Sequence, residues 1–239
     1  MKINAGKLNY RELNQWLRDT KEDCDIVDCR GQRFIAAGRK GGKITISGTP
    51  GNALGAYLDG TRLEVMGNAQ DAVGDTMNDG TIIIHGNVGD AAGYAMRGGS
   101  LYVKGNAGYR AGVHMKAYGD KFPVMVIGGR TGSFLGEYLA GGVIVVLGLH
   151  NDGKRIVHYF PCTGMHGGKV FLRSDCSTVD FPDKVHVASA TPEDLEEIRP
   201  YVEEYVRLFG GDAETLMKGP FTVVTPDSSN PYRQLYVTN

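Results

Sequence analysis

Two histidines and one cysteine are the residues of this sequence whose types suit nucleophilic catalysis. His114 and His166 each adjoin a methionine, and Cys162 lies four residues before His166. A thiol and an imidazole act as nucleophile and base only when a third group orients them and a cleft holds the substrate. The sequence indicates neither, so we favour a shared polar rim over a Cys–His site.

Metal and phosphate sites have weaker candidates. His150, Asp152 and His158 could meet around a metal, but their H-x-D-x₅-H spacing has no standard ligand geometry, and a solvated loop is favoured. The nucleotide-binding motifs G-x-G-x-x-G and G-x-x-x-x-G-K-S/T are absent. We therefore assign no catalytic, cofactor-binding or metal-binding residue. Three cations near the positions of His114 and His166 are interpreted as ordinary surface residues: Arg110, Lys116 and Arg130.

Glycine has the most regular spacing in the chain. The 239 residues include 35 glycines, about twice the usual share of ~7%. A first glycine ladder advances in steps of 19 residues, interrupted by one insertion of five, and a second ladder follows it seven residues later. Such self-similarity predicts a repeat architecture. The ladders are Gly48, Gly67, Gly86, Gly105, Gly129 and Gly148, and Gly55, Gly74, Gly93, Gly112 and Gly136.

The residues before each first-ladder glycine alternate between apolar and polar types. Two and four residues ahead of the glycine the side chain is always apolar, from Ile44 and Ile46 in the first unit to Ile144 and Val146 in the sixth. This is the period of a strand with one buried face. A short unit with one such strand buries that face only by stacking on its neighbours, ~4.8 Å apart.

The sequence therefore predicts an all-β fold, a single-stranded parallel β-helix of about seven coils over residues 41–175. In the last coil Cys162 replaces the corner glycine and Ser174 the ladder glycine. The sequence lacks the L-x-x-L-x-L pattern of a leucine-rich repeat, and a β-propeller needs blades of ~40 residues, so the β-helix is favoured over both.

The two ends do not repeat. Residues 1–40 are predicted to form a short α/β cap, with a helix from Tyr10 to Asp19 and a strand over residues 24–29. Residues 176–239 are predicted to form a helix that starts at Thr191 and ends at Gly210, followed by an extended tail that includes residues 221–224. This segment is expected to pack on the β-helix.

Coils five and six also place apolar side chains on the outward face. Such a patch is either covered by the chain itself or used to dock a partner. We expect the C-terminal helix and tail to cover part of it, and we retain the rest as a docking candidate. The patch consists of Val124, Val126, Val143, Val145 and Leu147.

Composition excludes several functional classes. With 26 basic and 27 acidic residues the chain has no basic surplus for nucleic acid. It has no apolar stretch long enough for a membrane helix and no apolar signal core. Its four cysteines are too few for a disulfide scaffold and fit reduced thiols in the cytoplasm.

Several segments of the repeat resemble the C-terminal domain of the glutamate synthase large subunit, known for its G-x-x-G-x-x-x-G (GXGXG) repeat. One of the subunits of formylmethanofuran dehydrogenase shares this domain. The resemblance covers about residues 40–175. The matching segments are Gly-Ala-Tyr-Leu (55–58), Ile-His-Gly (84–86), His-Met-Lys (114–116), Gly-Met-His-Gly-Gly (164–168) and, most specific of all, Phe134–Gly148.

The resemblance implies a right-handed β-helix with no catalytic residues of its own. In the family it supports an amidotransferase domain and a synthase domain with FMN and an iron–sulfur cluster, at a distance that lets ammonia pass between them. This chain has no cysteine nucleophile after Met1, no flavin barrel and no iron–sulfur cysteine cluster. We therefore expect no cofactor in this chain, and FMN and iron–sulfur in separate partner subunits.

The expected function is a non-catalytic structural subunit of a cytoplasmic glutamate synthase, bound to an amidotransferase subunit and a synthase subunit. One alternative is a structural subunit of a formylmethanofuran dehydrogenase-like complex. The other is a β-helix enzyme acting on carbohydrate, for which Asp71 and Asp90, one repeat apart, are the stacked acids. Two acids at that spacing mark a polar rim more often than a general acid/base pair.

Overall fold

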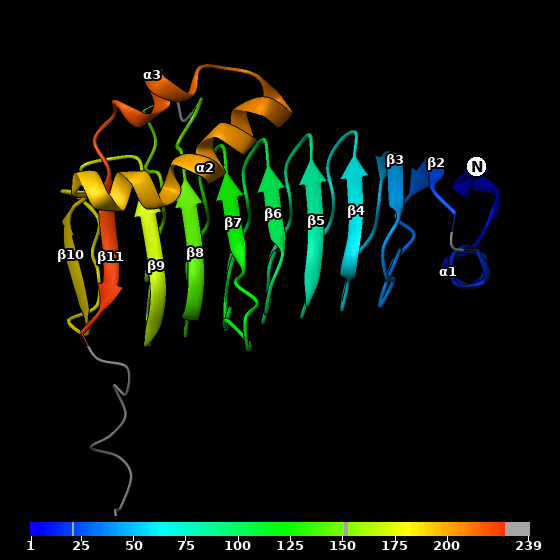
Figure 1. Cartoon of the computed structure of the whole chain (residues 1–239), viewed down its shortest axis with the longest axis horizontal. Helices are drawn as coiled ribbons and strands as arrows, with labels where there is room; N and C mark the ends of the chain where they lie inside the picture. Colours follow the sequence, from blue (N-terminus) through cyan, green and yellow to red (C-terminus); the bar gives the residue numbers. More distant parts are fainter. Residues whose placement is uncertain (21, 151–152, 228–239) are drawn as a thin grey trace, which may run out of the picture.

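The computed structural model describes residues 1–20, 22–150 and 153–227, and in these residues one sheet of 11 strands runs the length of the molecule (Figure 1). Its order is β1-β2-β3-β4-β5-β6-β7-β8-β9-β11-β10, and from β1 to β9 each strand pairs in parallel with the next. The parallel strands are β1 (Lys2–Asn4), β2 (Cys24–Arg30), β3 (Lys43–Thr49), β4 (Asp59–Val65), β5 (Asp79–Ile84), β6 (Ser100–Val103), β7 (Val124–Ile127), β8 (Ala140–Val146) and β9 (Gly167–Leu172).

The register of these strands is the one that the glycine ladder predicts. Ile44 pairs with Leu63, Ile82 with Leu101, and Met125 with Ile144. All twelve inward positions at two and four residues before the ladder glycines are 0% exposed, so they form one continuous aliphatic column. The prediction of a parallel β-helix is confirmed.

The column begins one coil earlier than the sequence suggested. Strand β2 pairs in parallel with β3, with Ile26 opposite Ile46 and Cys29 opposite Gly48. A bulge between Ile26 and Cys29 adds one residue, which shifts the alternating pattern relative to the ladder position and hides the repeat. The prediction that residues 1–40 do not repeat is therefore wrong for residues from β2 onward, and the solenoid has about eight coils.

The N-terminal end of the column is covered by β1, by the 3₁₀ helix η1 (Ala5–Lys7) and by α1 (Tyr10–Asp19). Leu13 and Leu17 of α1 are buried in the main core. The guanidinium of Arg39 donates to the carbonyl oxygens of Leu17, Thr20 and Glu22, at 2.8 to 2.9 Å, and so ties the end of α1 to the first coil. The expected helix and strand of this cap are both present.

Corner glycines are required where the backbone turns tightly against the column. Gly112 has φ +69°, and a Cβ there would lie 2.4 Å from Cδ1 of Ile144 in the core. The equivalent residue of the last coil is Cys162, at φ +60°. This confirms that Cys162 takes the place of the corner glycine, and it is fully buried.

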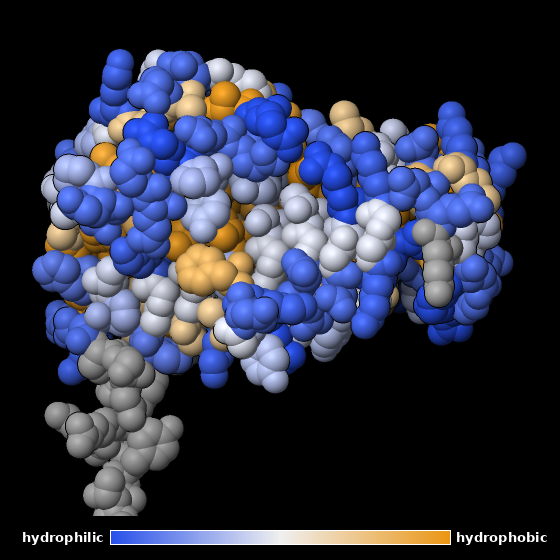
Figure 2. Space-filling model, viewed as in Figure 1, coloured by the Kyte–Doolittle hydropathy of each residue, from blue (hydrophilic) through white to orange (hydrophobic). Residues whose placement is uncertain are grey.

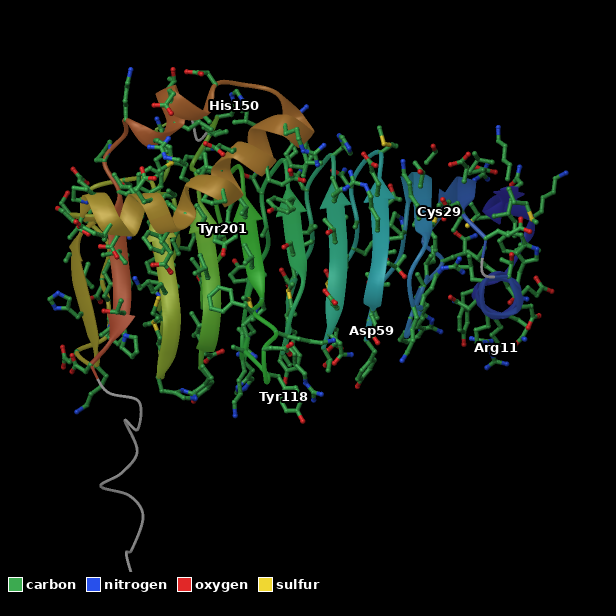
Figure 3. All side chains as sticks on the ribbon, viewed as in Figure 1. Arg11, Cys29, Asp59, Tyr118, His150 and Tyr201 are labelled. Carbon is green, nitrogen blue, oxygen red and sulfur yellow. The ribbon has the colours of Figure 1, made fainter. Side chains whose placement is uncertain are left out.

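The two insertions project at opposite edges of the sheet. The insertion of five residues contains Tyr118, at the lower edge in Figure 3, and the insertion of seven contains His150, at the upper edge. Lys121 of the first insertion reaches back along the column and pairs with Asp59, Nζ to Oδ1 3.3 Å. The strands on either side keep their register, with Ser100 opposite Val124. The repeat therefore accommodates insertions without a break in the column.

An asparagine ladder, which the sequence analysis did not predict, joins consecutive coils. The side-chain oxygen of Asn68 accepts from the N–H of Asn87, and Asn87 in turn accepts from Asn106, at 2.8 and 2.7 Å. Asn106 then accepts from the N–H of Arg130 at 2.9 Å. These bonds satisfy backbone donors at the corner after each strand, where the sheet pairing stops.

The C-terminal segment covers the other end and one side of the column. It contains β10 (Val185–Ser189), α2 (Pro192–Phe209), α3 (Ala213–Met217) and β11 (Thr222–Pro226). Strand β11 is antiparallel to both β9 and β10 and closes the last coil. Helix α2 has the predicted limits, because Thr191 caps its first turn and Gly210, at φ +85°, ends it.

Helix α2 lies over the outward face of β7 to β9 (Figure 1). Its Ile198, Val202 and Tyr205 pack against the apolar patch, and the Tyr205 hydroxyl donates to the carbonyl of Lys104 at 3.0 Å. In Figure 2 the hydrophobic atoms on this side gather beneath and beside α2, whereas the surface over the first strands is mainly hydrophilic.

The patch is therefore not a docking surface for a separate partner. Its five side chains, Val124, Val126, Val143, Val145 and Leu147, are 0 to 3% exposed because α2 covers them. The expectation that the chain covers its own patch is confirmed. The expectation that these residues dock a partner is wrong, since almost none of their surface is accessible.

The asparagine ladder gives a first prediction. Asn87→Ala removes one acceptor at a solvent-exposed corner and should lower the free energy of unfolding by about 1 kcal/mol, measured from the urea midpoint. Gln70→Ala serves as the control, because Gln70 is exposed and makes no side-chain hydrogen bond in the described residues. Equal midpoints for the two variants would show that the ladder contributes nothing to stability.

The contact between α2 and β9 gives a second prediction. Partial burial disfavours the charged form of Asp194, but hydrogen bonds from Thr191 and from Lys169, the latter at 3.1 Å, hold the pKa of this carboxyl below its ordinary value. The stabilisation is therefore complete above an unfolded pKa of about 3.9 and is lost as the pH falls below it.

Asp194→Asn should flatten the dependence of stability on pH below about pH 4, as measured by urea unfolding at a series of pH values. Glu203→Gln is the control, because Glu203 is exposed on the same helix without an ion pair in the described residues. An Asp194→Asn profile that falls as steeply as that of the wild type would contradict the prediction.

Candidate interaction site

The structure does not assemble the candidate Cys–His site. His114 stacks on Tyr138, with ring centroids 5.1 Å apart and planes at 8°, and meets Tyr94 edge-on at 5.8 Å. The Nδ1 atom of His166 lies 3.0 Å from the carbonyl oxygen of Gly164. Burial raises the pKa of the Cys162 thiol to about 12, so it remains protonated at neutral pH. The three side chains therefore have separate structural surroundings.

The other candidates are also separated. Asp152 lies outside the described residues, and the described residues contain no group of three or more His, Cys, Asp or Glu side chains that could hold a metal ion.

Asp71 and Asp90 form a second side-chain ladder, because Asp71 Oδ1 accepts from the N–H of Asp90 at 2.9 Å and Asp90 Oδ1 accepts from the N–H of Tyr109 at 2.8 Å. Each aspartate therefore uses one carboxylate oxygen to accept a hydrogen bond from the backbone of the next coil at this corner.

A row of left-handed residues runs along the corner that follows this ladder. Five positions after each position of the first glycine ladder, allowing for the insertions, and directly after Asp71 and Asp90, φ lies between +56° and +63° in seven successive coils. The side chain there is small in coils two to four and large in the later coils. The row is Phe34, Ala53, Ala72, Ala91, Arg110, Phe134 and Phe160.

The later coils place two groups of contacting rings, and Tyr109, along this corner and the row next to it in sequence, and we call these seven ring-bearing side chains the aromatic corner. Phe134 stacks on Phe160, with centroids 5.3 Å apart, and Phe160 in turn contacts Tyr159 at 6.2 Å. A neighbouring row contains the stacked rings of His114 and Tyr138. The aromatic corner consists of Tyr94, Tyr109, His114, Phe134, Tyr138, Tyr159 and Phe160.

Cations surround the aromatic corner. The guanidinium of Arg110 lies 5.3 Å from the ring centroid of Phe134, and that of Arg155 lies 6.0 Å from the ring of Tyr159. Hollows of about 150 and 330 Å³ adjoin Tyr109 and Tyr159, respectively, and Arg130 and His158 line both. Lys154 lines the larger one. Arg110 and Arg130, interpreted from the sequence as ordinary surface, thus belong to a cationic rim around exposed rings, and Lys116 stays interpreted as ordinary surface.

Another hollow, of about 820 Å³, lies at the N-terminal end between α1 and the first coil. Tyr10, Trp16 and Phe34 line it, and the guanidinium of Arg33 lies 4.6 Å from the ring of Tyr10. Its walls include the exposed polar side chains of α1, such as Arg11 and Glu12. It is larger than the hollows beside the aromatic corner, but the ring pair that lines it, Tyr10 and Phe34, is tilted by 51° and not stacked.

Fold and surface together define a parallel β-helix whose side chains maintain the column and present an exposed aromatic corner. The family model described as the GXGXG motif matches residues 26–225, and the chain belongs to that family. It is similar to the uncharacterized protein MJ1350 of Methanocaldococcus jannaschii, with 42% identity over 98% of this chain and 95% of that protein. None of the described helices is long and apolar enough to cross a membrane.

The environment of Cys162 gives a third prediction. Because its thiol is fully buried and its pKa is raised, iodoacetamide at pH 8 should leave Cys162 unmodified in the folded protein and alkylate it in denaturant. Peptide mass spectrometry after timed exposure measures both rates. Alkylation in the folded protein at a rate close to that in denaturant would restore Cys162 as a candidate nucleophile.

Proposed function

We propose that this chain is a non-catalytic structural subunit of a glutamate synthase, the enzyme that converts glutamine and 2-oxoglutarate to glutamate. The observation that carries the proposal is the match to the GXGXG motif family over residues 26–225. The same repeat characterises the C-terminal domain of the glutamate synthase large subunit, to which residues Phe134–Gly148 have their most specific resemblance.

The character of the described residues supports a scaffolding role. Cys162 is buried as a neutral thiol, and Asp71 and Asp90 bond to backbone donors of the next coil. A continuous column joined by backbone pairing at every coil is suited to holding two partners at a set separation. In this proposal FMN and the iron–sulfur cluster belong to a separate synthase subunit, an amidotransferase subunit releases the ammonia, and the complex works in the cytoplasm.

Reconstitution tests the proposal. The amidotransferase and synthase polypeptides of the same organism are purified separately and mixed with or without this chain. Glutamate formation from 2-oxoglutarate is then measured with glutamine and, separately, with ammonia. Because alignment of the two active sites affects only the transfer of ammonia between them, the chain should raise the glutamine-dependent rate at least ~10-fold and change the ammonia-dependent rate little.

Two results from mixing the chain with other polypeptides would contradict the proposal, and so would an activity of the chain itself. One is a glutamine-dependent rate that does not respond to the chain, together with no association by light scattering. The other is assembly with formylmethanofuran dehydrogenase polypeptides instead, which would support the alternative complex. Hydrolysis of a polysaccharide panel, lost in Asp71→Asn, would support the carbohydrate enzyme.

A further inference from the structure

The fold does not require large side chains at the aromatic corner. Ala53, Ala72 and Ala91 occupy the same left-handed position in earlier coils as Phe134 and Phe160 do in later ones. All five have φ between +56° and +63°. A left-handed conformation costs energy for any residue with a Cβ, and bulk adds no support to the turn. The large rings of the later coils therefore serve something other than the turn.

Several rings of the corner are exposed, including Tyr159 and Phe160, which contact each other. Tyr109, Tyr159 and Phe160 are 52%, 62% and 57% exposed. Aromatic side chains form the energetic centres of protein interfaces, because they bury a large area with few rotatable bonds. The corner spans the coils that follow β5 to β8, about 15 Å along the column at ~4.8 Å per coil. That length suits the centre of an interface of standard size.

The positive charge around the rings favours a partner with an acidic surface. Four cations lie beside the rings of the corner, and the only carboxylate paired with any of them in the described residues is that of Glu137, 4.0 Å from Arg110. A second copy of this chain would bring like charges together, so the rim disfavours a homodimer through this surface. The four cations are Arg110, Arg130, Lys154 and Arg155.

The arrangement of the rings argues against a single-stranded nucleic acid. Bases bind such platforms by stacking on free ring faces. Here His114 stacks on Tyr138 and Phe134 on Phe160, so these pairs already cover ring faces with one another. A protein surface with an apolar centre and a rim of Asp and Glu is the occupant that this chemistry fits.

We propose that the aromatic corner docks one of the other subunits of the complex, through a surface on that subunit that has an apolar centre and an acidic rim. This inference rests on the proposed function for the identity of the partner. It assigns the contact to the corner, and not to the outward sheet face that α2 covers.

The test measures binding of the full-length chain to each separately purified subunit by calorimetry. Phe160→Ala and Tyr159→Ala remove exposed rings, and Phe160→Ala places at this position the residue found at Ala91, so the fold should be kept. Tyr57→Ala is the matched control, because Tyr57 is a left-handed corner residue, 57% exposed, in an early coil. Equal urea midpoints for all variants establish that the fold is intact.

Phe160→Ala and Tyr159→Ala should each weaken binding to one subunit roughly 10- to 100-fold, while Tyr57→Ala changes it less than about 2-fold. Arg155→Glu should weaken binding and reduce its dependence on salt concentration. Lys184→Glu should change neither, because Lys184 is an exposed cation just before β10, away from the corner.

Three results would overturn the inference in distinguishable ways. If the wild-type chain binds a subunit and the ring variants bind equally well, the corner is not the docking surface and the proposed function stands. If the wild-type chain binds neither subunit, both fail. If it forms a dimer, or binds oligo(U) RNA, with an affinity that Phe160→Ala reduces, the occupant is a second copy or a nucleic acid.

Discussion

The structure depends on the burial of aliphatic side chains that no single coil can bury alone. Each coil contributes inward residues such as Ile82 and Ile84, and these become inaccessible to water only when the coils on either side are in place. Because Cα partners such as Ile82 and Leu101 stay in register, side chains of similar size stack directly above one another. Backbone pairing and apolar burial thus require the same spacing, and each reinforces the other.

This constraint explains how the ends and the corners are built. A column of finite length exposes an apolar cross-section at each end, and the chain covers one with α1 and the other with β11 and β10. At the corners the strand pairing stops, and side-chain oxygens of Asn87 and Asp90 take over as acceptors for the next coil. Unpaired backbone groups are thereby reduced at the places where the repeat itself does not supply partners.

Much of the fold could be predicted because the repeat period is strict. The inward positions, the corner role of Cys162 and the limits of α2 each follow from a local pattern that the tertiary structure does not override. The coil containing β2 could not be found in this way, because the bulge before Cys29 changes the spacing by one residue. The side-chain ladders were missed since hydrogen bonds between coils leave no apolar pattern in the sequence.

The site was harder to predict than the fold. The sequence drew attention to His114 and Cys162 as chemical groups, whereas the structure places one among aromatic rings and the other in the core. The left-handed row could have been found in the sequence by comparing the residue types five places after each position of the first glycine ladder. Such a comparison shows alanine at Ala72 and Ala91 and rings at Phe134 and Phe160, a change that the turn itself does not explain.

The constant step between coils also gives the molecule a length that can be adjusted in discrete increments. Removing or duplicating one 19-residue unit would shorten or extend the column by ~4.8 Å while leaving its cross-section unchanged. Evolution can therefore alter the separation between two bound proteins without redesigning either contact surface. Few globular domains allow this, because in most of them a change in length disturbs the whole core at once.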